Sequence, residues 1–207
     1  MKLYATSPSP FVRKVLVMAI ETGLSGRIEH VSLKTTPVAP DSELIRSNPI
    51  AKMPTLITDT GAALYDSRVI CEYLDSLHNG IRMFPVETTV RWTALRRQAL
   101  GDGVLDAAVS IRYETVLRPE EKLWREWIEG QMGKVRRGLD TLENEVATFD
   151  DDVNIGIVTA ACVAGYLDFR FPEEDWRATR PGLRNWYAEF SARDSMVKTQ
   201  PVGVVEA

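Results

Sequence analysis

The feature that most constrains the fold of this chain is a change of pattern near residue 80. Before it, short segments in which apolar and polar residues alternate are interspersed with segments whose apolar residues follow helical spacing. After it, apolar residues follow helical spacing almost throughout. The first 80 residues hold eight basic and eight acidic residues, so the whole net charge of −4 and all five tryptophans lie after the change. Segment 81–86 contains a proline and has no periodicity. We therefore expect two domains, 1–80 and 87–207, joined by a linker over 81–86.

The first domain is predicted to be a small mixed sheet with helices on its faces. Its elements are expected in this order: a strand over 2–5, a helix over 12–20, a strand over 28–33, a short helical segment around 41–46, a hairpin over 55–65 and a helix over 69–77. Gly23 stands where a glycine would end the first helix, and Asp59-Thr60-Gly61 forms the hairpin turn. Strands alternating with helices in this way are typical of an α/β domain.

The second domain is predicted to be a helical bundle. Its helices are expected over 90–104, with an extension to 113, and over 119–146, 154–167 and 181–193. The third of these is apolar on nearly every face, which is typical of a helix in the middle of a bundle. Most of the tryptophans are expected in the core, because they lie at helical spacing. The fold class is therefore α/β plus all-α.

Composition excludes several functional classes. A pI near 5.4 argues against a nucleic-acid surface, which requires a basic face. The longest apolar stretch, 155–167, is too short to span a bilayer, and no signal peptide is visible, so we expect a cytoplasmic protein without membrane contact. Cys71 and Cys162 show no metal-ligand or redox spacing, and we expect no metal and two buried thiols.

Two helix starts in the first domain carry polar residues suited to capping. Ser9 precedes Pro10, and proline is favoured at the first position of a helix. Arg13 and Lys14 place cations close to this first turn, where the helix dipole favours anions, so a bound anion in front of the turn would ease the conflict. Asp66-Ser67 opens the second helix in the same manner.

Four segments resemble the glutathione S-transferase family. They are SPSPFVRK at 7–14, NPIAKMPTL at 48–56, LYDS at 64–67 and GYLDFR at 165–170. The last is similar to small bacterial members, and the serine in the first loop resembles the serine-type, theta/beta-like members. The resemblance implies a thioredoxin-like domain that binds glutathione, a helical domain that lines the pocket of a second substrate, and a homodimer.

The resemblance also assigns roles to residues of the first domain. Ser9 would stabilise the glutathione thiolate as the catalytic residue, with Ser7 as the alternative. A cis bond between Met53 and Pro54 would turn the Met53 backbone toward the cysteinyl amide of glutathione, and Lys52 would meet the glycyl carboxylate.

At the second helix start, Ser67 would bind the γ-glutamyl carboxylate, and Asp66 would face the ammonium group. Phe11, Arg112 and Tyr113 are the residues expected in the electrophile pocket.

The function implied is a glutathione transferase that conjugates its co-substrate glutathione to a small hydrophobic electrophile in detoxification. Two alternatives stay open. One is another glutathione-dependent enzyme, a peroxidase, disulfide reductase or isomerase, although the first loop lacks the cysteine of the reductase chemistry. The other is a non-catalytic interaction module with the same fold.

Overall fold

The structure, a computed structural model, describes residues 1–149 and 153–202. The chain divides into two compact units. The first contains Met1–Val86 together with the described part of the segment from Asp194, and the second contains Glu87–Arg193. The expected second domain ran from residue 87 to residue 207, whereas the segment from Asp194 packs with the first unit.

The first unit contains four short strands and four helices. In chain order the elements are β1 (Lys2–Ala5), α1 (Pro10–Glu21), a 3₁₀ turn over Ser25–Arg27, β2 (Glu29–Ser32), α2 (Ser42–Ser47), β3 (Thr55–Ile57), β4 (Ala63–Leu64), α3 (Ser67–Ser76) and α8 (Asp194–Lys198). Every element expected before residue 80 is therefore present, with bounds within a few residues of the prediction.

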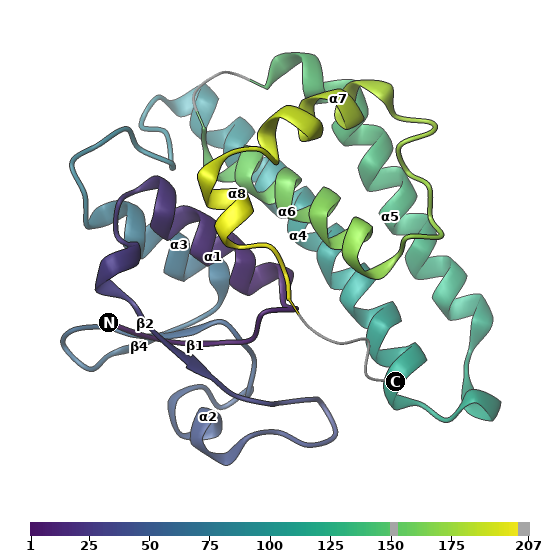
Figure 1. Cartoon of the computed structure of the whole chain (residues 1–207), viewed down its shortest axis with the longest axis horizontal. Helices are drawn as coiled ribbons and strands as arrows, with labels where there is room; N and C mark the ends of the chain where they lie inside the picture. Colours follow the sequence, from purple (N-terminus) through teal and green to yellow (C-terminus); the bar gives the residue numbers. More distant parts are fainter. Residues whose placement is uncertain (150–152, 203–207) are drawn as a thin grey trace. The chain divides into compact units, whose positions relative to one another are not determined.

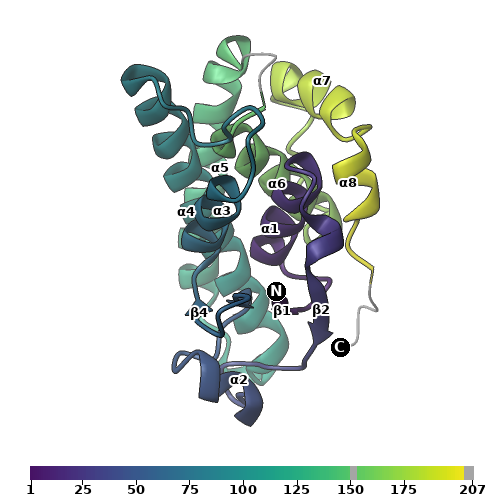
Figure 2. The same ribbon diagram turned by 90° about the vertical axis from the view of Figure 1, so that its left-hand side faces the viewer.

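The strands form one mixed sheet in the order β2-β1-β3-β4. β1 pairs with β2 in parallel, with Leu3 opposite His30, and with β3 antiparallel, with Tyr4 opposite Thr55. The β3–β4 hairpin places Leu56 opposite Leu64. Helices α1 and α3 pack together on one side of this sheet, and α2 lies on the other (Figures 1 and 2). This is the thioredoxin-like arrangement that the resemblance implied.

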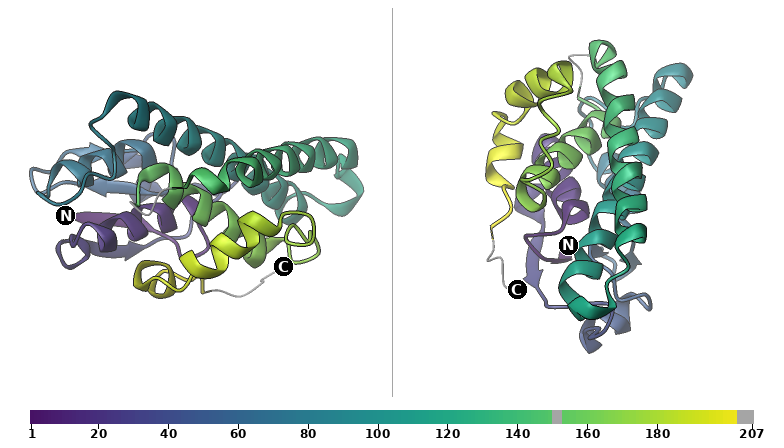
Figure 3. Two further views of the ribbon diagram at one scale, coloured as in Figure 1. Left: turned by 90° about the horizontal axis from the view of Figure 1, so that it is seen from above. Right: turned by 90° about the vertical axis from the view of Figure 1, so that its right-hand side faces the viewer.

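The second unit is all-helical in its described residues. Its elements are α4 (Thr88–Leu117), a 3₁₀ turn over Glu120–Lys122, α5 (Arg125–Glu145), a 3₁₀ turn over Val146–Thr148, α6 (Ile155–Arg170) and α7 (Pro181–Phe190). The two long helices α4 and α5 run side by side (Figure 3). Trp124 lies in extended backbone before α5, so the helix expected from residue 119 begins only at Arg125.

Helix α6 forms the centre of this unit. Every residue from Ile155 to Leu167 is buried, as the sequence predicted. The packing on α4 is close because two glycines lack side chains: an added Cβ at Gly156 would lie 2.7 Å from the Ala94 carbonyl oxygen, and one at Gly101 would lie 2.6 Å from Thr159 Cγ2. The Asn154 Oδ1 accepts hydrogen bonds from the backbone N–H groups of Gly156 and Ile157, so Asn154 caps the helix.

The aromatic core of the second unit is smaller than predicted. Most of the tryptophans were expected in the core, but Trp92 and Trp124 are 64% and 63% exposed and lie outside it. Trp92 lies in the first turns of α4, and Trp124 precedes α5, where the bundle does not cover them. Trp176 is buried and packs edge-on against Tyr187, and Trp186 packs on Phe149 and Phe190. Cys71 and Cys162 are buried, as expected, and the two are not joined in a disulfide.

Candidate functional site

The loop between β1 and α1 is held by Ser9. Its backbone N–H donates to the Thr6 carbonyl over 3.1 Å, and its Oγ accepts a hydrogen bond from the Val12 N–H over 3.3 Å. Pro10 occupies the first helical position. Ser9 is thus the N-cap of α1, as its position before proline predicted. A hydroxyl has one donor hydrogen in addition to its acceptor lone pairs, so capping leaves the Ser9 O–H available to donate to a ligand.

The alternative hydroxyl, that of Ser7, has a different environment. Ser7 is exposed, and its Oγ accepts a 2.7 Å hydrogen bond from the Val202 N–H, which belongs to the segment that returns to the first unit. Ser7 therefore ties the loop to the C-terminal segment. The two hydroxyls are distinguished by what they hold: Ser9 holds the helix start and Ser7 holds the returning chain.

The two cations of α1, Arg13 and Lys14, are both buried. Arg13 is buried, and its guanidinium donates to the Met196 carbonyl over 3.0 Å and to Thr199 Oγ1 over 3.4 Å. Its charge is therefore directed to the segment around α8, which corrects the expectation that Arg13 favours an anion at the first turn. The Lys14 ammonium lies 5.9 Å from the centre of the Phe11 ring. Phe11 itself is partly exposed.

The loop before β3 is organised by a buried asparagine that the sequence analysis did not single out. Asn48 is fully buried; its Nδ2 donates to the Lys52 carbonyl over 3.0 Å and to Thr55 Oγ1 over 2.9 Å, and its Oδ1 accepts from the Ile50 N–H over 3.2 Å. Thr55 Oγ1 donates in turn to the Lys52 carbonyl over 2.9 Å. The side chain of Lys52 is exposed. An asparagine directly before a proline is a loop signal that could have identified this residue.

The peptide bond that this loop leads into, Met53–Pro54, is cis, which confirms the prediction made for it. The Tyr65–Asp66 peptide bond is also cis, and nothing in the sequence predicted that.

The start of α3 has the predicted cap. The Asp66 carboxylate accepts a 2.9 Å hydrogen bond from the Arg68 N–H, and Asp66 is the N-cap residue. Ser67 is the first helical residue and is only 2% exposed. The first N–H groups of a helix have no partner within it, so this end of α3 is suited to a carboxylate.

Sheet register brings these three segments to one end of the sheet. Because Tyr4 pairs with Thr55, the loop that leaves β1 and the loop that enters β3 lie at the same end. Because Leu56 pairs with Leu64, the turn that leads from β4 into α3 also lies there. Two helix starts and the cis Met53–Pro54 segment therefore surround one area, which offers N–H donors, a hydroxyl and a carboxylate to a zwitterionic ligand.

Arg112 and Tyr113, expected in the electrophile pocket, belong to the second unit. Both lie on α4; Arg112 is partly exposed, and Tyr113 is 40% exposed. Burial raises the pKa of Tyr113 above its ordinary value. Within residues 1–149 and 153–202 no group of His, Cys, Asp and Glu side chains is arranged to hold a metal ion. No helix among them is long and apolar enough to cross a membrane.

Comparison with known proteins places these features in one family. The family model described as "Glutathione S-transferase, N-terminal domain" matches residues 8–77, and "Glutathione S-transferase, C-terminal domain" matches residues 125–189. The chain is 31% identical over 205 residues to the uncharacterized GST-like protein YibF of Escherichia coli (strain K12), covering 97% of this chain and 98% of that protein.

Two solved structures are similar over nearly the whole chain. A glutathione transferase family member from Pseudomonas fluorescens Pf-5 with bound glutathione has a TM-score of 0.95 and 44% identity, covering 98% of this chain and 99% of that one. A structure of a family member from the same organism with bound S-(propanoic acid)-glutathione has a TM-score of 0.91 and 43% identity, covering 97% and 99%.

Proposed function

This chain belongs to the glutathione S-transferase family, and from that premise we propose that it binds glutathione as the thiolate and conjugates it to a hydrophobic electrophile. The observation that supports this most directly is the sheet register, which gathers the Ser9 loop, the Met53–Pro54 segment and the start of α3 at one end of the sheet. The relatives solved with glutathione and with S-(propanoic acid)-glutathione support the same ligand.

At the thiol end, Ser9 acts as the catalytic residue. Its O–H donates a charge-assisted hydrogen bond to the glutathione sulfur, which stabilises the thiolate over the thiol. The free N–H groups at the start of α1 add positive potential at the same place. The thiolate then attacks the electrophilic carbon, the carbon–sulfur bond forms, and the leaving group departs with its electron pair.

The rest of glutathione is bound by backbone groups and helix starts. The Met53 backbone pairs with the cysteinyl amide, Pro54 fixes the direction of the chain there, and Lys52 meets the glycyl carboxylate. Ser67 and the first N–H groups of α3 bind the γ-glutamyl carboxylate, and Asp66 faces the ammonium group. The two opposite charges of the γ-glutamyl group are thus matched separately.

The electrophile is bound by the second unit, with Phe11, Arg112 and Tyr113 at its pocket. We extend the proposal to a cytoplasmic homodimer acting in detoxification, as the family resemblance implies.

Calorimetry with glutathione tests the proposal. Wild type is expected to bind with a Kd in the micromolar to millimolar range, and Ser67→Ala is expected to weaken binding roughly tenfold, since it removes a hydrogen bond to a charged group. Ser76→Ala, an exposed serine at the other end of the same helix, is the matched control. If wild type does not bind glutathione, the fold assignment is unaffected, and the result supports a non-catalytic interaction module instead.

A further inference from the structure

Helices α4 and α6 run in the same direction through the second unit. Gly156 lies against Ala94 and Arg97, and further along both helices Gly101 lies against Thr159. About three turns beyond that contact, each helix carries an arginine: Arg112 on α4 and Arg170 on α6. The register of the packed pair thus brings the two guanidinium groups to the same level.

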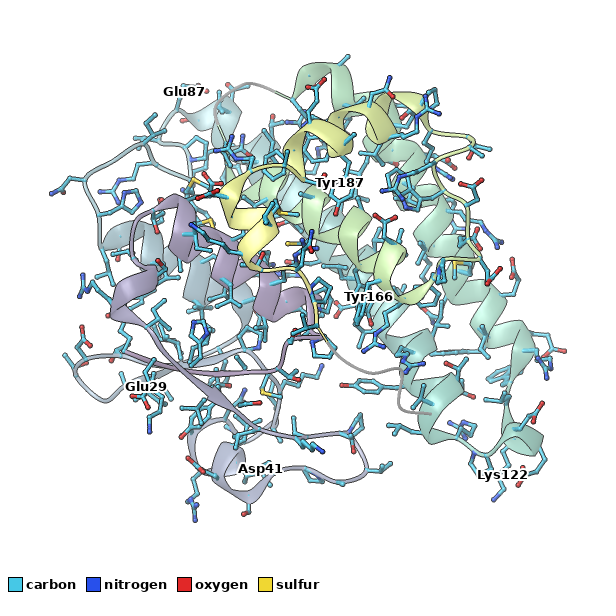
Figure 4. The ribbon with its side chains drawn as sticks, in the orientation of Figure 1. Glu29, Asp41, Glu87, Lys122, Tyr166 and Tyr187 are labelled. Carbon is cyan, nitrogen blue, oxygen red and sulfur yellow. The ribbon has the colours of Figure 1, made fainter. Side chains whose placement is uncertain are left out.

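Two phenols accompany the two arginines. Tyr113 follows Arg112, and Tyr166, labelled in Figure 4, precedes Arg170 by one turn of α6. Burial raises the pKa of Tyr166 to about 12, and the charges of Arg170 and Arg112 act against this rise. The phenol therefore stays protonated near neutral pH and can donate a hydrogen bond. Burial also lowers the pKa of Arg170, and the neighbouring charge of Arg112 lowers it further.

The nearest carboxylates along both helices are already paired elsewhere. Glu114 accepts from Arg118 over 2.8 Å. Asp168 accepts from Arg177 over 2.6 Å and from the indole N–H of Trp176 over 3.0 Å.

Arg170 stacks on Phe169 with its guanidinium carbon 4.1 Å from the ring centre, and its Nε is buried without a hydrogen-bond partner in the part of the chain that the structure describes. Over the same residues no carboxylate pairs with Arg112. Two neighbouring cations, one of them partly desolvated, are thus left without a counter-charge.

We infer that Arg112 and Arg170, assisted by the hydroxyls of Tyr113 and Tyr166, bind an anionic group, a carboxylate, on the second substrate. The inference rests on the proposed function and specifies its substrate class: an electrophile with an apolar body and an acidic end. The guanidinium pair fixes that end by charge-assisted hydrogen bonds.

A pair of glutathione conjugates that differ only in the acidic group tests the inference by calorimetry. S-(4-carboxybenzyl)glutathione is expected to bind wild type roughly tenfold or more tightly than S-benzylglutathione, because its carboxylate gains hydrogen bonds to charged groups. Arg112→Gln and Arg170→Gln should each remove most of this preference. Arg184→Gln removes an exposed arginine from α7 and should keep the preference.

The outcomes separate the inference from the proposed function. If both conjugates bind wild type with equal affinity, or the neutral one binds more tightly, the carboxylate site is wrong and glutathione binding stands. If neither conjugate nor glutathione binds, the proposed function fails, and the inference fails with it. Arg170→Lys keeps the charge in case Arg170→Gln does not fold, and it should retain part of the preference. Full loss of the preference in a folded Arg170→Lys together with an unaffected Arg112→Gln would also overturn the site.

A turnover measurement gives a second readout. With 4-chloro-3,5-dinitrobenzoate and its methyl ester, the thiolate attacks the carbon that bears chlorine, the carbon–sulfur bond forms and chloride leaves. The acid is expected to have the higher kcat/KM in wild type, although its carboxylate is the less activating substituent. The order should reverse in Arg112→Gln, and an ester preference in wild type would contradict the inference.

Discussion

The Ser9 hydroxyl accepts the Val12 N–H and still has its own hydrogen to donate, so capping and catalysis do not compete for it. Ser9→Ala should therefore have two separate effects. The thiol pKa of bound glutathione, followed by ultraviolet thiolate absorbance against pH, should rise by about one unit, as expected for loss of a hydrogen bond to the charged form. The free energy of unfolding should fall by about 1 kcal/mol, as expected for loss of an N-cap. Ser7→Ala should leave the thiol pKa of bound glutathione unchanged. If this pKa rises in Ser7→Ala and not in Ser9→Ala, Ser7 is the catalytic residue and Ser9 only caps the helix.

Asn48 determines the shape of the loop that enters β3. Its side chain is fully buried and makes three hydrogen bonds, so Asn48→Ala leaves the Lys52 carbonyl and the Ile50 N–H with fewer partners. We expect a loss of about 2 kcal/mol in the free energy of unfolding by urea, and at least tenfold weaker glutathione binding. Asn185→Ala, at an exposed position on α7, is the control. A destabilised variant with unchanged glutathione affinity would show that the loop does not position the Met53 backbone.

At the scale of the elements, the contact between α4 and α6 depends on Gly156. A Cβ there would lie 2.7 Å from the Ala94 carbonyl oxygen and 2.8 Å from Arg97 Cβ, so Gly156→Ala must push the helices apart. The expected cost is about 2 kcal/mol in urea unfolding, in the range of overpacked cores. Gly130→Ala on α5 is the matched control, because no atom lies within 4 Å of its added Cβ; helix propensity should make it neutral or stabilising. Equal effects of the two substitutions would contradict the close packing.

Ion pairs between α4 and the end of α5 make the second unit sensitive to acid. Arg96 and Arg97 donate to Glu145 over 2.8 and 3.0 Å, and these bonds, with that from Arg96 the larger cause, hold the pKa of the Glu145 carboxyl below its ordinary value. A lowered folded pKa adds stability that is present above the unfolded pKa, about 4.3, and is lost as pH falls through the folded value. Glu145→Gln should therefore destabilise by roughly 1 kcal/mol near neutral pH, and this difference should vanish in acid. Glu189→Gln, exposed on α7, should show no such change.

The sequence predicted correctly the features that are decided by residues close together in the chain. The hairpin around Gly61 and the helix starts at Ser9, Asp66 and Asn154 were correctly predicted, because a cap or a turn is decided within a few residues. The cis bond before Pro54 came from family resemblance alone. The exposure of Trp124 was missed because it depends on which residues fold against it. The role of Asn48 was missed although its partners are local, because an asparagine before a proline signals a loop but not the hydrogen bonds within it.

At the scale of the whole molecule, the two units are interleaved along the chain. Sequence pattern placed one boundary near residue 80, with a linker over 81–86, and assigned everything from residue 87 on to the helical half, since α8 is helical like its neighbours. Its membership is decided by contacts more than 170 residues apart: Ser195 Oγ donates to Glu21 over 2.5 Å, and Arg13 reaches the Met196 carbonyl. No local pattern carries that information. The same long-range contacts place the returning segment beside the Ser9 loop, through Ser7.

Truncation of the chain after Arg193 tests this interleaving, because the tryptophans report on one unit only. All five lie in the second unit, so their fluorescence follows the unfolding of that unit, whereas circular dichroism follows both. Removing α8 takes away the buried Met196 side chain and the acceptors of Arg13, which should cost the first unit about 3 kcal/mol. When the truncated chain is unfolded in urea, circular dichroism should show a transition at low urea concentration that tryptophan fluorescence does not show. Met196→Ala should shift the same transition by a smaller amount at full chain length. A dichroism curve unchanged in both variants would mean that α8 contributes nothing to the first unit.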